Sequence, residues 1–349
     1  MIILTVISAL IFFSVMIFVH ELGHFACAKY FGVKVKEFAL GMGPSVYKKQ
    51  RGETLYSVRA VPIGGYVTME GEDEQSDDPR SFSSLAPWKK FIIVVAGAVM
   101  NLLLGFVLCI FVVASRGVAA VPVVAAVNPD SPAEIAGILP GDRIIKINGH
   151  RISLQSEVQF QIYRSRGAET SVIVLRGGEE KQFYITPQFL EDEGRYVIGY
   201  SGTVLNLNFA ESIKYAFHNL YFYCSSVIFS LGDLLTGRES VKNLSGPVGI
   251  VGTIGSVVDT AMNDKQIDGL LSMLNLLILL TVNLGVFNLL PFPALDGGRL
   301  VFIVIEQITR KKIPPEKEGV IHFVGFALLM ALVIFATGND LIRIKDSFM

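Results

Sequence analysis

The sequence predicts a membrane protein with an α-helical core of four transmembrane helices, a cytoplasmic-side β-hairpin and an inserted extracytoplasmic α+β domain. Hydrophobic residues make up 51% of the 349-residue chain, and they gather into four long runs at 2–19, 91–114, 270–290 and 320–336. A helix needs about 20 apolar residues to cross the hydrocarbon core of a bilayer. Between the second and third runs, short β-branched segments alternate with turn signals, which indicates strands.

Basic residues indicate how these runs are oriented. Lys and Arg gather at 29–90 and again at 299–317, and cytoplasmic loops carry this excess. Both segments are therefore expected in the cytoplasm, and residues 116–268 outside. A net charge of −1 gives no indication of a nucleic-acid partner. The spans of this multi-pass protein of the cytoplasmic membrane are expected at about 2–28, 90–115, 269–290 and 318–337, in core halves 1–115 and 269–349.

The first span has a competing interpretation as a cleaved signal peptide, with Ala26-Cys27-Ala28 as the processing site. However, no basic residue precedes its apolar stretch, and three ionisable residues interrupt its end. A retained first span is the better reading of that pattern.

The end of the first span reads "FVHELGHFAC". Residues four apart share a helix face, so His20 and His24 can bind one cation. Glu21 lies beside them as a candidate general base, in the H-E-x-x-H pattern of zinc peptidases. Ionisable groups inside a span are costly and usually functional. The alternative is a histidine pair that merely reaches the membrane interface.

The segment "TLYSVRAVPIGGYVTMEGED" follows in the cytoplasmic loop. Two strand-like runs flank the turn signal at 62–65, which predicts a β-hairpin over about 54–70. Dipping toward the membrane, it would offer an edge on which an extended chain can pair. Gly64, Gly65 and Tyr66 are the candidate contacts on that edge. The alternative is a solvated hairpin that only holds the loop in shape.

Residues 116–203 are expected to form the inserted domain. Its stretch "SPAEIAGILPGDRIIKINGHRI" resembles the PDZ module, with a capped short helix at 131–137 and a strand at 143–147. PDZ modules commonly accept a peptide by strand addition. A peptide ligand and a role as a size filter both remain open.

Residues 204–268 are expected to contain an interfacial amphipathic helical segment. Residues 209–237 are apolar and aromatic, but charged and polar residues recur along them, which suits a helix lying in the membrane interface. A fifth span here would reverse the third run and move the basic cluster at 299–317 outside. An ordinary packing helix of the outer domain is the remaining alternative.

The third metal ligand is predicted in "NLGVFNLLPFPALDGGRL". A catalytic zinc takes three protein ligands and keeps a fourth position open. Cys27 shares the face of the histidines, but seven residues of helix rise about 10 Å, too far for convergence. Pro291 and Pro293 interrupt the third helix near its cytoplasmic end. Asp296 follows at once, on the same side as the histidines, and is the better candidate.

Together these motifs resemble the site-2 protease family of intramembrane zinc metalloproteases. The single PDZ module matches its bacterial branch, that of regulator of sigma-E protease. The stretches 97–105 ("GAVMNLLLG") and 41–44 ("GMGP") resemble the family's second-span motif and glycine loop. The main motifs are His20-Glu21-x-x-His24 and Asn288-x-x-Pro291-x-Pro293-x-Leu295-Asp296-Gly297.

The resemblance implies a zinc endopeptidase that cuts transmembrane segments of single-span proteins, such as anti-sigma factors or remnant signal peptides, in regulated intramembrane proteolysis. It implies Zn²⁺ on His20, His24 and Asp296, and Glu21 as the base. Asn288, Pro291 and Pro293 join the hairpin residues as substrate contacts.

Two alternatives stay open. A membrane zinc protease with a cytosolic active site would remove misfolded proteins, but such enzymes usually take a glutamate as third ligand. A non-catalytic PDZ scaffold would tolerate loss of Glu21 or Asp296, and both are present.

Overall fold

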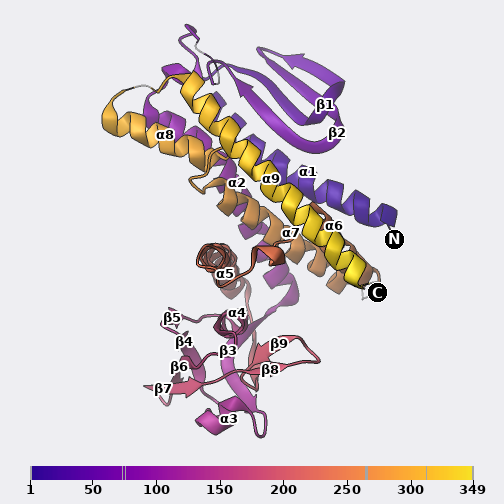
Figure 1. The fold of residues 1–349 in the computed structure, drawn as a ribbon, viewed down its shortest axis with the longest axis vertical. Coiled ribbons are helices and arrows are strands. Elements are labelled where there is room, and N and C mark those ends of the chain that lie inside the picture. The colour runs from indigo at the N-terminus through magenta and orange to yellow at the C-terminus, as the bar shows by residue number, and fades with distance from the viewer. Residues whose placement is uncertain (1, 73, 75, 264–265, 312, 348–349) are drawn as a thin grey trace. The chain divides into compact units, whose positions relative to one another are not determined.

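The computed structural model describes residues 2–72, 74, 76–263, 266–311 and 313–347. The chain divides into two compact units, one made of residues 1–108 with 227–349 and the other of residues 109–226. The first holds most of the long helices and the second most of the short strands (Figure 1). The helical unit is therefore built from both ends of the chain, and the second unit is an insertion in it.

The four predicted spans are confirmed as long apolar helices, each with a stretch suited in length and hydropathy to crossing a bilayer. Helices suit hydrocarbon because their backbone groups bond within the same segment. The helices are α1 (Ile2–Tyr30), α2 (Pro87–Arg116), α7 (Gln266–Asn288) and α9 (Pro315–Ser347). A short 3-10 turn, η1 (Phe82–Ser84), precedes α2, and another, η2 (Val241–Asn243), precedes α6 (Pro247–Asn263).

A sheet of two long strands, β1 (Val35–Arg51) and β2 (Thr54–Met69), packs on α1. The predicted hairpin at 54–70 is in fact β2 alone, and the chain turns back at residues 52–53 instead of at 62–65. Residues 35–40 pair with 65–69 on one edge and with 55–58 on the other. The first part of β2 thus pairs with one edge of this segment of β1, and the last part of β2 pairs with the opposite edge. The Pro and Gly residues at 62–65 lie where β2 crosses from one edge to the other.

Helix α6 lies inside the first unit, although the sequence analysis treats the whole of 204–268 as interfacial. Its Ile254 and Val258 are buried in an apolar cluster with side chains of α1 and α7. With 17 residues, three of them glycine, α6 is too short to be recognised as a span.

Helix α5 (Phe209–Leu235) occupies the segment predicted to be amphipathic. Phe209, Ile213, Phe217 and Tyr221, spaced by four, are exposed along one face. This apolar stripe is compatible with a helix lying in the membrane interface, which stays a prediction.

Helix α8 (Asp296–Thr309) lies between the third and fourth spans and was not distinguished from them in the sequence. It follows the short loop 289–295. A Cβ atom at Gly297 would lie 2.0 Å from the carbonyl oxygen of Leu290. The loop therefore folds tightly onto the first turn of α8, and this close contact fixes Asp296 at the start of the helix.

The second unit is a small α+β domain, as predicted. Its main sheet has the strand order β10-β3-β4-β6-β7, with β5 paired to β4. Ser131 caps α3 by accepting a hydrogen bond of 3.3 Å from the N–H of Glu134. The helices are α3 (Pro132–Ala136) and α4 (Gln155–Ser165), and the strands are β3 (Val118–Val127), β4 (Arg143–Ile147), β5 (His150–Arg151), β6 (Thr170–Arg176), β7 (Glu179–Ile185), β8 (Gln188–Leu190), β9 (Arg195–Val197) and β10 (Tyr200–Asn206).

A buried ion pair holds the turn before β4. Asp142 is fully buried, and Arg176 donates to its two oxygens at 2.7 and 2.6 Å. The N–H of Leu139 adds a third hydrogen bond of 2.9 Å. Burial alone would raise the pKa of Asp142, but these donors outweigh it and hold the pKa below its ordinary value.

Replacing Asp142 by Ala should lower the free energy of unfolding of the second unit by about 2 kcal/mol, because the turn loses three hydrogen bonds. Since the folded pKa is depressed, this contribution is present above about pH 4 and is lost as the pH falls through the folded value. Pulse proteolysis of the full chain in detergent at pH 7 and pH 3 measures both effects. Asp192→Ala, in an exposed turn, is the control. Equal destabilisation by the two substitutions would contradict the assignment.

Candidate metal centre

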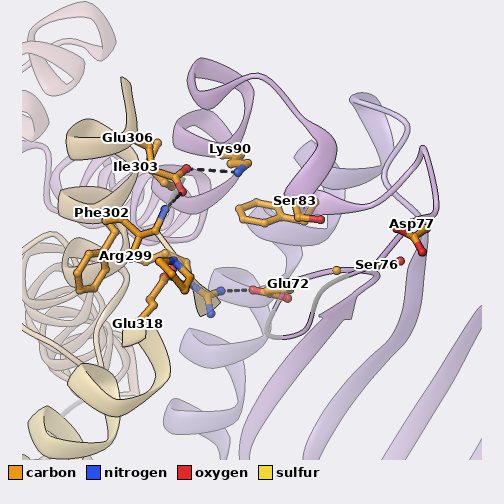
Figure 2. A pocket seen from close by; sticks show the side chains of 14 residues that line it. Glu72, Ser76, Asp77, Ser83, Lys90, Arg299, Phe302, Ile303, Glu306 and Glu318 are labelled. Atoms are coloured by element: carbon orange, nitrogen blue, oxygen red, sulfur yellow. Dashed lines mark hydrogen bonds and ion pairs between the residues drawn. The ribbon is translucent and has the colours of Figure 1, made fainter. Parts of the chain in front are cut away.

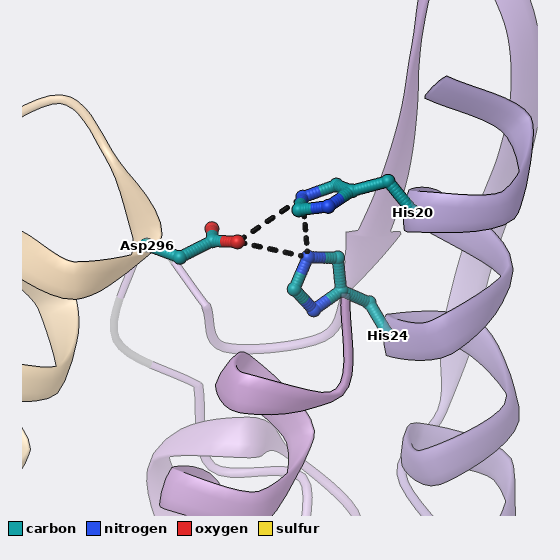
Figure 3. Close-up of side chains that lie close together, drawn as sticks. All are labelled: His20, His24 and Asp296. Atoms are coloured by element: carbon teal, nitrogen blue, oxygen red, sulfur yellow. Dashed lines mark hydrogen bonds and ion pairs between the residues drawn. The ribbon is translucent and has the colours of Figure 1, made fainter. Parts of the chain in front are cut away.

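Helix α1 presents two imidazoles toward one point. His20 and His24 are one helical turn apart, and they are only 8% and 9% exposed. Their Nε2 atoms lie 3.2 Å from each other (Figure 3). Both rings therefore offer the same nitrogen to a common position.

Asp296 completes the group from the other half of the chain. Its Oδ2 lies 3.1 Å from Nε2 of His20 and 3.3 Å from Nε2 of His24. Figure 3 shows this carboxylate reaching the two rings from α8. The three side chains predicted as ligands are thus brought together, although His24 and Asp296 are 272 positions apart in the chain.

The three atoms suit a tetrahedral zinc ion. With bonds of about 2.0–2.1 Å, such an ion holds its ligand atoms about 3.3 Å apart. The observed separations of 3.1, 3.2 and 3.3 Å match this value. Oδ2 of Asp296 is buried and makes no hydrogen bond of ordinary geometry with any described residue. A buried carboxylate oxygen of this kind needs a cation, so the donor set fits zinc.

Cys27 does not join this group. Its half-buried side chain packs against an apolar cluster that includes Ala28 and Val33. The metal-ligating group found among the described residues consists of the two histidines and Asp296.

Helix α2 passes directly beneath the two rings. The N–H at Nδ1 of His24 donates to the backbone carbonyl of Ile93, 2.8 Å away. A Cβ atom at Gly97 would lie 2.3 Å from Nε2 of His24 and 2.7 Å from Cε1 of His20. Only a glycine leaves room for both imidazoles here. In the sequence, this glycine stood out only as part of a second-span motif, which indicated no role for it.

Strand β2 lies next to Glu21. The backbone N–H of Val67 donates to the Glu21 carboxylate. A Cβ atom at Gly65 would lie 3.3 Å from Cγ of Glu21, so this glycine permits the close approach of strand and helix. The candidate base thus lies between the predicted ligands and the predicted peptide-binding strand.

The two other residues of β2 that were predicted to contact substrate, Gly64 and Tyr66, lie in different surroundings. Gly64 has a φ of 91° and packs under Met42, whereas the ring of Tyr66 stacks on Arg59, 5.0 Å from the guanidinium carbon. Arg59 in turn pairs with Glu37 at 2.7 Å, so Tyr66 belongs to a polar cluster on the sheet.

The two prolines lie in the loop after α7, which ends at Asn288. Pro293 packs closely against Gly325 of α9, where a Cβ atom would lie 2.4 Å from Cβ of the proline. Pro291 lies two residues earlier and is exposed. Pro293 therefore fixes the loop that carries Asp296.

A polar network that the sequence analysis missed also anchors this loop. His322 accepts a hydrogen bond of 3.0 Å at Nδ1 from the N–H of Ala294. Arg299 pairs with Glu72 and lies 3.6 Å from Glu318, beside a cavity of about 410 Å³ (Figure 2). These partners come from the turn after β2, the loop before α8, α8 itself and α9, so no local spacing could have indicated them.

The sequence model of peptidase family M50 matches residues 8–332. A relative from Clostridium acetobutylicum is 38% identical over 97% of each chain. Zinc metalloprotease RasP of Shouchella clausii is 31% identical and covers 97% of this chain and 99% of its own. Among solved structures, the PDZ domain of an SdrC-like protein from Listeria monocytogenes is 24% identical, covers 25% of this chain and 87% of its own, and gives a TM-score of 0.22.

Replacing Gly97 by Ala should weaken zinc binding about 10- to 100-fold, because the added methyl group displaces both imidazoles. Chelator competition on purified protein measures the affinity. Gly338→Ala is the matched control, since that glycine also lies in a span helix but has nothing within 4 Å of its Cβ position. Wild-type affinity in the Gly97 variant would contradict the proposed packing.

Proposed function

This chain belongs to peptidase family M50, the site-2 proteases, and is a multi-pass membrane zinc metalloprotease; from that premise we propose that it cuts peptide bonds inside membrane-spanning segments. The observation that carries the proposal is the convergence of His20, His24 and Asp296 within a helical unit. The two histidines are buried in α1, a helix suited to spanning the bilayer.

The source of the third ligand favours this proposal over a protease with a cytosolic site. Such enzymes usually take a glutamate further along a helix, whereas Asp296 comes from the tight loop between α7 and α8. A non-catalytic scaffold would have no need of a buried ligand set, which is costly to maintain.

His20 and His24 would hold zinc through Nε2 and Asp296 through Oδ2, and bound zinc would supply a Lewis acid for the scissile carbonyl. The Glu21 carboxylate accepts the proton of the attacking water and later donates it to the departing amine nitrogen. Burial of both imidazoles excludes bulk water, which strengthens the electrostatic effect of the charged groups.

A helical substrate must unwind before its carbonyl groups can react. Because β2 approaches Glu21 at Gly65 and Val67, an extended chain beside this strand would pass close to the base. We assign substrate contact to Gly64, Gly65 and Tyr66 on the strand, and to Asn288, Pro291 and Pro293 around the loop. Edge pairing would replace the helical hydrogen bonds that the substrate gives up.

The expected substrates are single-span proteins already shortened by a first cut, of the anti-sigma-factor or remnant-signal-peptide class. The PDZ-like second unit would restrict or bind their outer parts. It contains a cavity of about 330 Å³ beside α4, whose lining includes Tyr200 and Gln155, joined by a hydrogen bond of 2.8 Å from the Tyr200 hydroxyl to Gln155. A peptide terminus is the ligand that such a groove would take.

Glu21→Gln should bind zinc normally but lose at least about 100-fold in cleavage of a co-expressed single-span substrate, because the proton acceptor is removed. Asp296→Asn should lose both zinc and cleavage. Zinc content of purified protein and the amount of cleaved substrate are the two measurements. Cys27→Ala is the control and should match the wild type. Cleavage retained by the Glu21 variant would remove this residue from the role of base.

Reporter fusions test the proposed orientation. A fusion after Lys49 should report the cytoplasmic face, because basic residues surround it, whereas a fusion after Gly177 should report the outside. Paired reporters that are active on opposite faces, such as alkaline phosphatase and a fluorescent protein, distinguish the two. Both fusions on one face would break the four-span arrangement.

A further inference from the structure

We propose that Asn101 is a positioning residue that fixes which nitrogen of His20 faces the metal. This inference rests on the proposed zinc site and adds a second layer to it. It concerns how α2 orients the ligands that α1 presents.

One face of α2 contacts both imidazoles. Ile93, Gly97 and Asn101 are spaced by four residues and therefore lie in one row on the helix. The carbonyl of Ile93 contacts His24, Gly97 leaves space for the two rings, and the amide of Asn101 reaches His20. The row therefore makes one polar contact with each histidine, and the space left by Gly97 lies between these two contacts.

The direction of the hydrogen bond between His24 and Ile93 follows from the chemistry of the two groups. A carbonyl oxygen can only accept, so Nδ1 of His24 must carry the proton that it donates to Ile93 at 2.8 Å. In a neutral ring Nε2 then keeps its lone pair, which faces Asp296. The backbone of α2 thus selects the tautomer of His24 that can bind a metal through Nε2.

His20 needs the same tautomer to present Nε2 to the same ion. Its Nδ1 must then carry a proton and find an acceptor. Asn101 is fully buried, and its amide nitrogen Nδ2 lies 3.4 Å from Nδ1 of His20. Two donors cannot share a hydrogen bond, so this orientation of the amide does not serve the metal-binding tautomer.

The oxygen of the same Asn101 amide can supply the acceptor that Nδ1 of His20 needs. Oδ1 of Asn101 is buried and has no hydrogen-bond partner within the described part of the chain. A half-turn of the amide exchanges Oδ1 and Nδ2 with little change in shape. Oδ1 then accepts from Nδ1 of His20, and Nδ2 takes the place in which the oxygen has no partner. In the zinc-binding state Asn101 therefore supplies an acceptor, as the Ile93 carbonyl does for His24.

The position of Asn101 is suited to this role. Oγ1 of Thr281, on α7, donates to the backbone carbonyl of Asn101 at 3.4 Å, so two helices hold the residue. Asn283 on α7 offers a comparison, because its Oδ1 is also buried and unpartnered among the described residues. Within the described part of the chain, the Nδ1 atoms of His24 and His20 contact Ile93 and Asn101, respectively.

The test compares Asn101→Leu with Asn101→Asp in the purified full chain. Leu has a similar size but no acceptor, so zinc affinity should fall about 10- to 100-fold. Asp keeps an acceptor oxygen, so zinc should bind at least as tightly as in the wild type. Chelator competition gives the affinities, and the visible absorption of the Co²⁺-substituted protein reports the ligand geometry. Asn283→Leu is the matched control and should leave both readouts unchanged.

Equal affinities and cobalt spectra for wild type and Asn101→Leu would overturn the proposal, as would equal weakening by Leu and Asp, which indicates packing alone. Asn101→Ala, which removes the amide without adding volume, replaces the Leu variant if that variant does not fold. Failure of the wild-type protein to bind zinc would instead refute the proposed function, so the two failures are distinguishable.

Discussion

The structure depends on holding two imidazoles and a carboxylate together inside a helical unit that is largely apolar. Each of these groups is costly to bury alone, and one cation shared by all three would offset that cost. Every neighbouring element is arranged to keep them together. Helix α1 sets the spacing of the rings, α2 packs beneath them, and the loop before α8 brings Asp296 to within 3.3 Å of both nitrogens.

The protein separates ligand placement from substrate placement. Helices and one tight loop position the proposed metal ligands, so small displacements are resisted by close packing at Gly97 and Gly297. The sheet lies on the other side of Glu21 and approaches it through Gly65 and Val67. Glu21 is therefore the link between the proposed metal centre and the proposed binding strand, which is the geometry that a general base requires.

Much of this arrangement was predictable because its signals are local. Two histidines at four-residue spacing share a face of any helix, and proline residues interrupt any helix. The hairpin was only partly predictable. Residues 62–65 do change the direction of the chain, but they do not form the end of a hairpin. They lie where β2 crosses from one edge of β1 to the other. Helices α6 and α8 were not predicted as separate elements. Helix α6 is short and rich in glycine, and helix α8 is short and amphipathic.

The sequence alone determined the number of long apolar helices and predicted the ligand types and the candidate base, since hydrophobic run length and residue spacing act within one segment. Tertiary structure decided what those residues meet. The contacts of His24 with Ile93 and of His20 with Asn101, and the network from Glu72 to Arg299, join residues far apart in the chain. Such pairs follow from helix packing and loop closure, which depend on the shapes of all the elements together. They therefore produce no periodic pattern in the sequence of any single element.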